Sequence, residues 1–243
     1  MMLYKLLKAD RYKLKGAPVW LAFLLMPVVP ALLGTLNYMA NIELLQSEWY
    51  SLWTQHTLFT CYFFLPVMLG IYCAYLMRLE HSNHNWNKVL TMPVPAYQIF
   101  ISKLLTASFM LCASQIWIGI LFVLSGKIAG LTAPVPIELT GWLACGTLGG
   151  IVMVSIQLCL SLAIKSFALP VGLSLAGGIS GLVALAKGFG HVYPYALMAY
   201  GMKANAPQTM MDSGYLAFAA ICLLYIVLFT VTGSLLLSRR DVK

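Results

Sequence analysis

Apolar residues dominate six long stretches of the chain, and charged or proline-containing segments separate them. A helix that crosses the hydrocarbon core of a membrane needs about 20 largely apolar residues, and each stretch reaches that length. Four of them contain long runs without a single Asp, Glu, Lys or Arg. The pattern therefore predicts an all-α integral membrane protein with six transmembrane helices, at residues 17–38, 57–77, 104–125, 139–164, 166–187 and 214–237.

The composition supports a lipid environment and limits what else the chain can contain. Of its 243 residues, 61% are apolar and only 9% are charged, whereas about a quarter of the residues in a soluble domain are charged. Six spans leave only short connections, so we expect residues 1–243 to form a single transmembrane domain. A nucleotide-binding domain does not fit in the remainder. Energy for any transport has to come from a partner protein or an ion gradient.

The basic residues predict the orientation of the spans. Loops on the cytoplasmic side of a membrane protein carry an excess of Lys and Arg. With six spans, 12 of the 15 basic residues fall on the side that holds the N-terminal arm, the connection after the second span and the C-terminal tail. We therefore expect both termini to be cytoplasmic. The net charge of +8 is explained by this asymmetry and by anionic lipid headgroups, without nucleic-acid binding.

The N-terminal arm, residues 1–16, combines leucines with basic residues at helical spacing. Such a segment forms a short helix on the inner membrane surface, or it is a frayed basic tail that only sets the topology.

An intramembrane enzyme would need ionisable groups inside the bilayer, and these are almost absent from the expected spans. The Glu80-His81-Ser82-Asn83-His84 segment lies in a loop and lacks the spacing of a zinc site. The sequence contains neither a GxSxG nucleophile motif nor a GKS/T phosphate loop. We therefore expect no catalytic residue, no metal and no cofactor in this chain. The six cysteines lie in apolar stretches and are interpreted as free thiols.

A few polar and small residues within the spans suggest contacts between helices. Gln115 and Gln157 each need a hydrogen-bond partner, either on another helix or in a wet pathway. Two GxxxG pairs allow close approach of helix backbones and are expected to pack within the subunit rather than on a surface that shifts during transport: Gly146, Gly150, Gly177 and Gly181.

The connection after the second span, residues 78–103, is the most informative part of the sequence. It reads RLEHSNHNWNKVLTMPVPAYQIFISK. The segment around Trp86 is amphipathic, and Pro93 and Pro95 end it. We interpret it as a short helix with an exposed tryptophan and leucine that docks a cytosolic partner. The alternative is a solvated loop whose apolar residues pack against the ends of the spans.

This connection resembles the permeases of ABC-2 type exporters, in particular the branch linked to lantibiotic immunity and bacitracin resistance. The resemblance extends, more weakly, over the whole chain through its six spans, basic arm and basic end. The matching positions within the connection are Glu80, His81, Asn85, Trp86, Lys88, Leu90, Thr91, Pro93, Val94, Lys103 and Leu104.

The resemblance implies a mechanism and a set of partners. Residues 80–93 would form a coupling helix that fits into a separate ATPase subunit, and ATP and Mg would be bound there. Two ATPases would work with two permeases, the second permease being identical or paralogous. The complex would lie in the bacterial cell membrane and expel an amphiphilic peptide antibiotic. The segment 188–213 would correspond to a short extracellular re-entrant region.

Three other functions remain open from the residues. A membrane scaffold or sensor would keep the spans and the docking loop but would not transport. An ion-coupled carrier is disfavoured because the spans lack acidic relays. An intramembrane enzyme is disfavoured because no catalytic constellation is visible.

Overall fold

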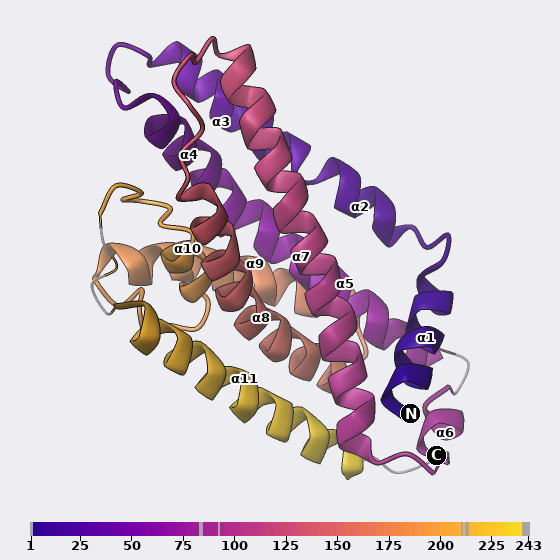
Figure 1. The fold of residues 1–243 in the computed structure, drawn as a ribbon. Coiled ribbons are helices and arrows are strands. Elements are labelled where there is room, and N and C mark those ends of the chain that lie inside the picture. Colours follow the sequence, from indigo (N-terminus) through magenta and orange to yellow (C-terminus); the bar gives the residue numbers. More distant parts are fainter. Residues whose placement is uncertain (1, 83–84, 92, 210, 212–213, 240–243) are drawn as a thin grey trace.

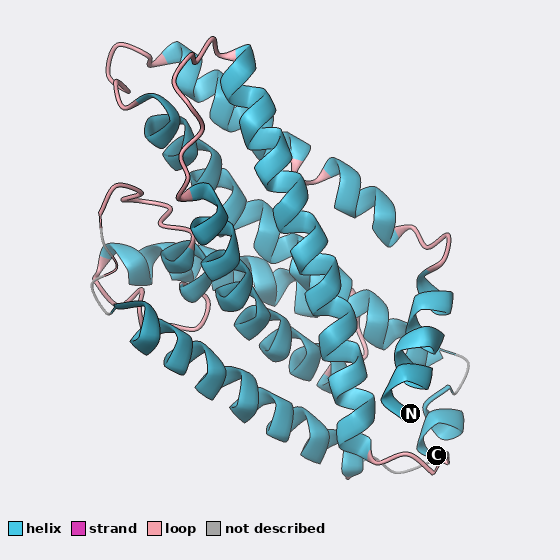
Figure 2. Ribbon diagram, viewed as in Figure 1, coloured by secondary structure: helices cyan, strands magenta, loops and turns pink. Residues whose placement is uncertain are grey.

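The chain forms a bundle of long helices (Figures 1 and 2) in the computed structural model, which describes residues 2–82, 85–91, 93–209, 211 and 214–239. No strand occurs among these residues. The helices are α1 (Met2–Leu14), α2 (Val19–Leu25), α3 (Val28–Ala40), α4 (Glu48–Phe59), the π-helix η1 (Thr60–Phe64), α5 (Leu65–His81), α6 (Asn85–Leu90), α7 (Ala96–Ile128), α8 (Leu139–Ala163), α9 (Ala168–Ala186), α10 (Leu197–Gly201) and α11 (Gly214–Ser238).

Six helical segments in the described part of the chain are long and apolar enough to cross a membrane, as the sequence predicts. Two boundaries differ clearly from the prediction. The second span begins at Glu48 rather than at residue 57, and the third begins at Ala96 rather than at 104. At about 1.5 Å per residue, these helices of 34 and 33 residues are much longer than the roughly 30 Å hydrocarbon core. Polar turns therefore extend the helices beyond the apolar runs.

Two prolines explain irregular turns in the first two spans. Pro27 separates α2 from α3, because proline has no amide hydrogen to donate and its ring clashes with the preceding turn. In the second span, α4 and α5 are joined by the π-helix η1, which ends just before Pro66. The carbonyl of Pro66 accepts a hydrogen bond from Ser174 Oγ at 2.6 Å. The second span is thus held against α9 immediately after its irregular turn.

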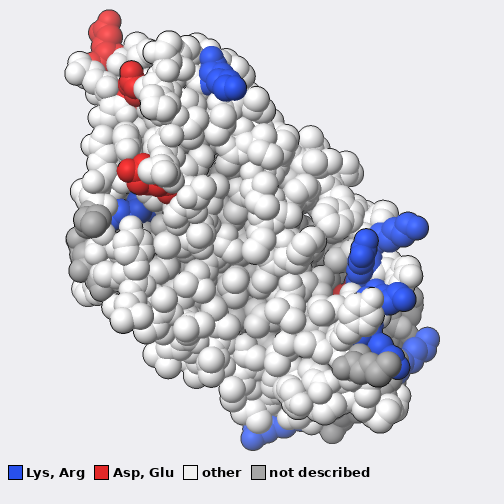
Figure 3. All heavy atoms as spheres, in the orientation of Figure 1, with Lys and Arg blue, Asp and Glu red and all other residues white. Residues whose placement is uncertain are grey.

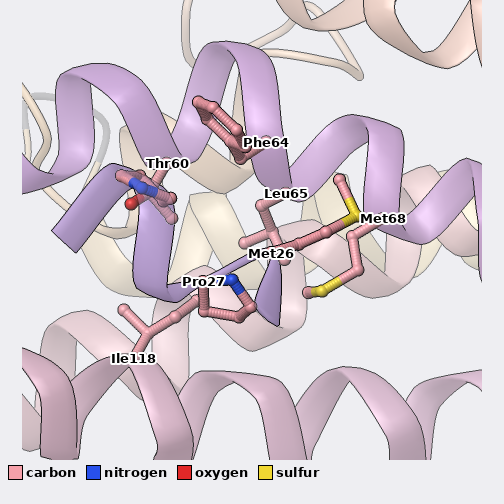
Figure 4. A pocket seen from close by; sticks show the side chains of 8 residues that line it. Met26, Pro27, Thr60, Phe64, Leu65, Met68 and Ile118 are labelled. Atoms are coloured by element: carbon pink, nitrogen blue, oxygen red, sulfur yellow. The ribbon is translucent and has the colours of Figure 1, made fainter. Parts of the chain in front are cut away.

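The two irregular turns lie beside each other. A small apolar crevice forms where the break in the first span meets η1, the start of α5 and α7 (Figure 4). Its lining consists of Met26, Pro27, Pro30, Thr60, Phe64, Leu65, Met68 and Ile118.

The chain between α9 and α11 folds back into the bundle. Its short helix α10 packs against α8, and Leu197 and Met198 are completely buried. Trp53 Nε1 donates to the carbonyl oxygen of Met202 at 2.8 Å, and Tyr62 OH donates to Asn205 Oδ1 at 3.0 Å. Side chains of the second span therefore satisfy polar groups of this re-entrant segment.

Charges gather at opposite ends of the bundle. Figure 3 shows most of the visible Lys and Arg at the end that carries α1 and α6, and most of the visible Asp and Glu at the other end. We call these the basic end and the acidic end. The surface between them is almost free of charge in this view, as expected for a surface that faces lipid.

The contact between α8 and α10 depends on a glycine. A Cβ atom at Gly149 would lie 2.5 Å from the carbonyl oxygen of Leu197. We predict that Gly149→Ala separates α10 from α8 and lowers the stability of the detergent-solubilised protein by about 1–3 kcal/mol. Thermal unfolding measures the effect. Gly172→Ala on α9 is the control, because a Cβ there meets nothing within 4 Å. Equal melting temperatures for the two variants would contradict the role of Gly149.

Candidate functional site

A cluster of four charged side chains joins three helices at the basic end. Lys103 at the start of α7 lies 2.5 Å from Asp10 Oδ1 on α1 and 2.6 Å from Glu80 Oε1 near the end of α5. Lys13 of α1 lies 2.5 Å from the same oxygen of Glu80. Ser102 Oγ donates to Asp10 Oδ2 at 2.6 Å. We refer to Asp10, Lys13, Glu80 and Lys103 as the ionic cluster.

The ionic cluster balances its own charge inside a protected site. Two carboxylates face two ammonium groups, and the side chains of Asp10, Glu80 and Lys103 are at most 5% exposed. Removal of one partner from such a group leaves an uncompensated buried charge, which costs several kcal/mol. Because only one alignment of the helices satisfies all four charges, the cluster fixes α1 against α5 and α7.

His81 connects the end of α5 to two further elements. Its Nδ1 accepts a hydrogen bond from Trp86 Nε1 on α6 at 3.2 Å, and its Nε2 lies 3.0 Å from the carbonyl oxygen of Ser161 on α8. Since an indole nitrogen can only donate, Nδ1 is the acceptor and Nε2 carries the hydrogen that is donated to Ser161. A neutral imidazole satisfies both contacts.

The end of α5 also contacts α9. The guanidinium of Arg78 lies 5.7 Å from the centre of the Phe167 ring, within the range of a cation–π contact. Together with Glu80 and His81, this residue connects the last turn of α5 to α1, α6, α7, α8 and the approach to α9. A displacement of α6 relative to the bundle therefore acts on most of the spans through one helical turn.

The structure corrects the interpretation of the predicted docking residues. Trp86 is only 7% exposed and packs edge-on against His81, so the prediction of an exposed tryptophan is wrong. Glu80 is 1% exposed and faces the cluster rather than the surface. The indole and the carboxylate find partners within the chain, and these partners cover them.

The outward surface of the connection is formed by other members of the predicted set. Lys88, Thr91 and Pro93 are exposed, and Asn85 is half-buried with its amide donating to the carbonyl of Leu79. The side chain of Leu90 lies outside the described residues. We call Lys88, Thr91 and Pro93 the exposed face of the connection.

Gln115 and Gln157 both lie against the re-entrant segment. Gln157 Nε2 donates to the hydroxyl of Tyr195 at 3.0 Å, and Gln115 Nε2 lies 3.7 Å from the sulfur of Met202. Burial raises the pKa of Tyr195 to about 12, so its hydroxyl remains neutral at physiological pH. Both glutamines are at most 2% exposed.

The four glycines of the GxxxG pairs are all close to other parts of the same chain. A Cβ atom at Gly150 would lie 2.7 Å from Leu111 of α7, and one at Gly181 would lie 2.8 Å from the carbonyl oxygen of Tyr195. Side chains at Gly146 and Gly177 would overlap Met202 and Tyr195. Three of the four glycines therefore make room for the re-entrant segment rather than for another span.

Sequence reasoning missed the ionic cluster around Glu80. Asp10 was not identified as a site residue, although it is the only acidic residue before Glu43 and stands among five basic residues of the arm. Lys103 was noted only as a position of resemblance. The available signal is a single carboxylate within a strongly basic segment. Such an isolated acidic residue indicates a specific ion pair.

An all-helical bundle with six candidate spans and a connection fixed to its basic end defines a multi-pass membrane protein. The family model described as ABC-2 family transporter protein matches residues 6–181, which include the ionic cluster and the exposed face. The chain therefore belongs to the ABC-2 transporter family, as a transport permease subunit that is not itself catalytic. No curated protein and no solved structure matches the chain.

The geometry of the ionic cluster predicts a loss of stability when one of its lysines is removed. Lys103→Ala leaves Asp10 and Glu80 with only Lys13 as a counter-ion, so we expect a loss of about 3–5 kcal/mol in thermal unfolding and faster proteolysis of the N-terminal arm. Lys88→Ala is the matched control, because it removes the same charge from the exposed face. If both variants unfold at the same temperature, the cluster does not fix α1.

Proposed function

We propose that this chain is the membrane-spanning permease subunit of an ABC-2 exporter that is powered by a separate ATPase. The observation that carries the proposal is the last turn of α5, which connects α6 to α1, α7, α8 and the residue that precedes α9. A permease without its own nucleotide site needs such a connection, because motion of the ATPase reaches it at one surface and has to be transmitted to several spans.

The charge distribution supports an orientation with the basic end in the cytoplasm. Four basic residues of α1 lie at this end together with Lys88 and Lys103, and cytoplasmic segments are rich in Lys and Arg. Both termini are then cytoplasmic in a bacterial cell membrane. The exposed face lies where a cytosolic ATPase can reach it, and α1 lies near the inner leaflet.

The proposed coupling step proceeds through the ionic cluster. ATP and Mg, bound by the partner ATPase, drive closure of two ATPase copies that contact the exposed faces of two permeases. Motion of α6 is transmitted through Trp86 and His81 to Ser161, and motion of the last turn of α5 through Glu80 to Lys103 and Asp10. The helices α1, α7 and α8 then move together with α5. The second permease is a copy of this chain or a paralogous one.

The proposed substrate is an amphiphilic peptide antibiotic of the lantibiotic or bacitracin type, expelled for resistance or self-protection. The resemblance of residues 80–104 supports this choice. Long apolar faces also support it: in α11 only 17% of the best spanning window is buried within the chain. Such faces remain accessible to lipid or to a second permease, and an amphiphile enters from the lipid phase.

Cross-linking at the exposed face tests the docking step. We predict that Lys88→Cys and Thr91→Cys, in a background with the half-buried Cys112 and Cys145 replaced by Ser, become linked by a bifunctional maleimide to a nucleotide-binding subunit in native membranes. Lys127→Cys at the end of α7, which lies at the opposite end of the bundle, should not become linked. Mass spectrometry of the products identifies the partner. Linkage to a protein without nucleotide-binding motifs would instead favour a scaffold or sensor.

A further inference from the structure

A cavity opens at the acidic end, far from the ionic cluster. Its volume is about 300 Å³. It lies between the first turns of α4, α8 and α11 and the end of the re-entrant segment, and its lining includes Tyr50, Glu138, Trp142, Cys145, Lys203 and Tyr215. In the proposed orientation this end faces outward, where an exporter releases its substrate.

The cavity has a negatively charged wall. Glu138 immediately precedes α8 and forms no ion pair with any described residue. Among the described residues, the one hydrogen bond of its carboxylate is with the hydroxyl of Tyr50, which donates to Oε2 at 3.4 Å. The positive end of the α8 dipole stabilises a carboxylate at this position. Glu138 therefore presents an acceptor that the protein itself does not neutralise.

Aromatic side chains around Glu138 form the apolar part of the lining. The Tyr50 and Trp142 rings lie 5.8 Å apart in an edge-on arrangement, and Trp142 stacks at 5.1 Å on the buried Trp53. This packing holds the wall in place before a ligand arrives. Tyr215 is 58% exposed at the rim. A carboxylate beside tyrosine and tryptophan rings is the combination that attracts organic ammonium groups.

The cationic side of the lining is already engaged elsewhere. Lys203 has a left-handed backbone, with φ at +53°, and its ammonium group donates to Thr209 Oγ1 at 3.3 Å. The separation between Lys203 and Glu138 exceeds the 4 Å of an ion pair, since none joins these two described residues. A ligand cation at Glu138 therefore does not have to displace a lysine.

We infer that this cavity is a binding site for an organic ammonium group, with Glu138 as its counter-ion and Tyr50, Trp142 and Tyr215 as its apolar lining. The inference rests on the proposed function insofar as it assigns the substrate class: a cationic amphiphile whose ammonium group occupies the cavity before release. Binding itself requires neither the ATPase nor transport.

The test uses the full chain in nanodiscs of phosphatidylcholine and three soluble probes of similar size. Phenyltrimethylammonium carries the cation, benzyl alcohol is neutral and benzenesulfonate is anionic. Isothermal titration calorimetry should detect binding of phenyltrimethylammonium only. Because Glu138 is exposed, Glu138→Gln should weaken this binding about two- to fivefold, as the loss of a solvent-exposed charge pair does.

Glu43→Gln is the matched control, since it removes the same charge from another exposed position at the same end that does not line the cavity, and it should leave the affinity unchanged. Tyr215→Ala should weaken binding without changing the melting temperature. Equal affinities for Glu138→Gln and Glu43→Gln would overturn the inference, and so would stronger binding of benzenesulfonate. Neither result would affect the cross-linking of the ATPase, so failure of this site and failure of the proposed function are distinguishable.

Discussion

The buried ion pairs of Lys103 are the contacts on which the basic end of the molecule depends. One ammonium group holds Asp10 of α1 and Glu80 of α5 at 2.5 and 2.6 Å. Such a group is weak evidence for net stability, because desolvation offsets much of the attraction. Its structural effect is to fix the relative position of the helices. An apolar helix can slide or rotate in lipid, whereas a buried charge has only one set of partners. The cluster thus gives α1 and the last turn of α5 a fixed position against α7.

The opposite half of the bundle is held by uncharged contacts. Indole, hydroxyl and amide groups of the second and fourth spans bind the re-entrant segment, and glycines of α8 and α9 admit its backbone. The helices α5, α7 and α8 run from the ionic cluster towards this segment (Figure 1). Motion of the connection can therefore be transmitted along these continuous helices. The cavity beside Glu138 lies at the far end of the helices.

Hydropathy predicted the number and approximate place of the spans because the bilayer imposes a simple length requirement. It missed the early starts of the second and third helices, since Trp49 and Lys103 are amphipathic or charged residues whose partners come from distant segments. For the connection after the second span, the prediction of an exposed Trp86 was wrong, and the docking role of the connection stays a prediction. Trp86 is amphipathic, and only the folded position of His81 shows that its indole hydrogen bond is made inside the chain. The role of Asp10 likewise depends on the way α1 folds back onto α7.

Purification of the tagged chain from its native membrane in mild detergent, with identification of the co-purifying proteins, tests the central claim most directly. An ATP-driven permease predicts a stoichiometric soluble subunit with nucleotide-binding motifs, and this subunit should be lost when Lys88, Thr91 and Pro93 are replaced together. Recovery of the intact chain alone, or with a partner that binds no nucleotide, would contradict the account and leave the exposed face without its proposed role.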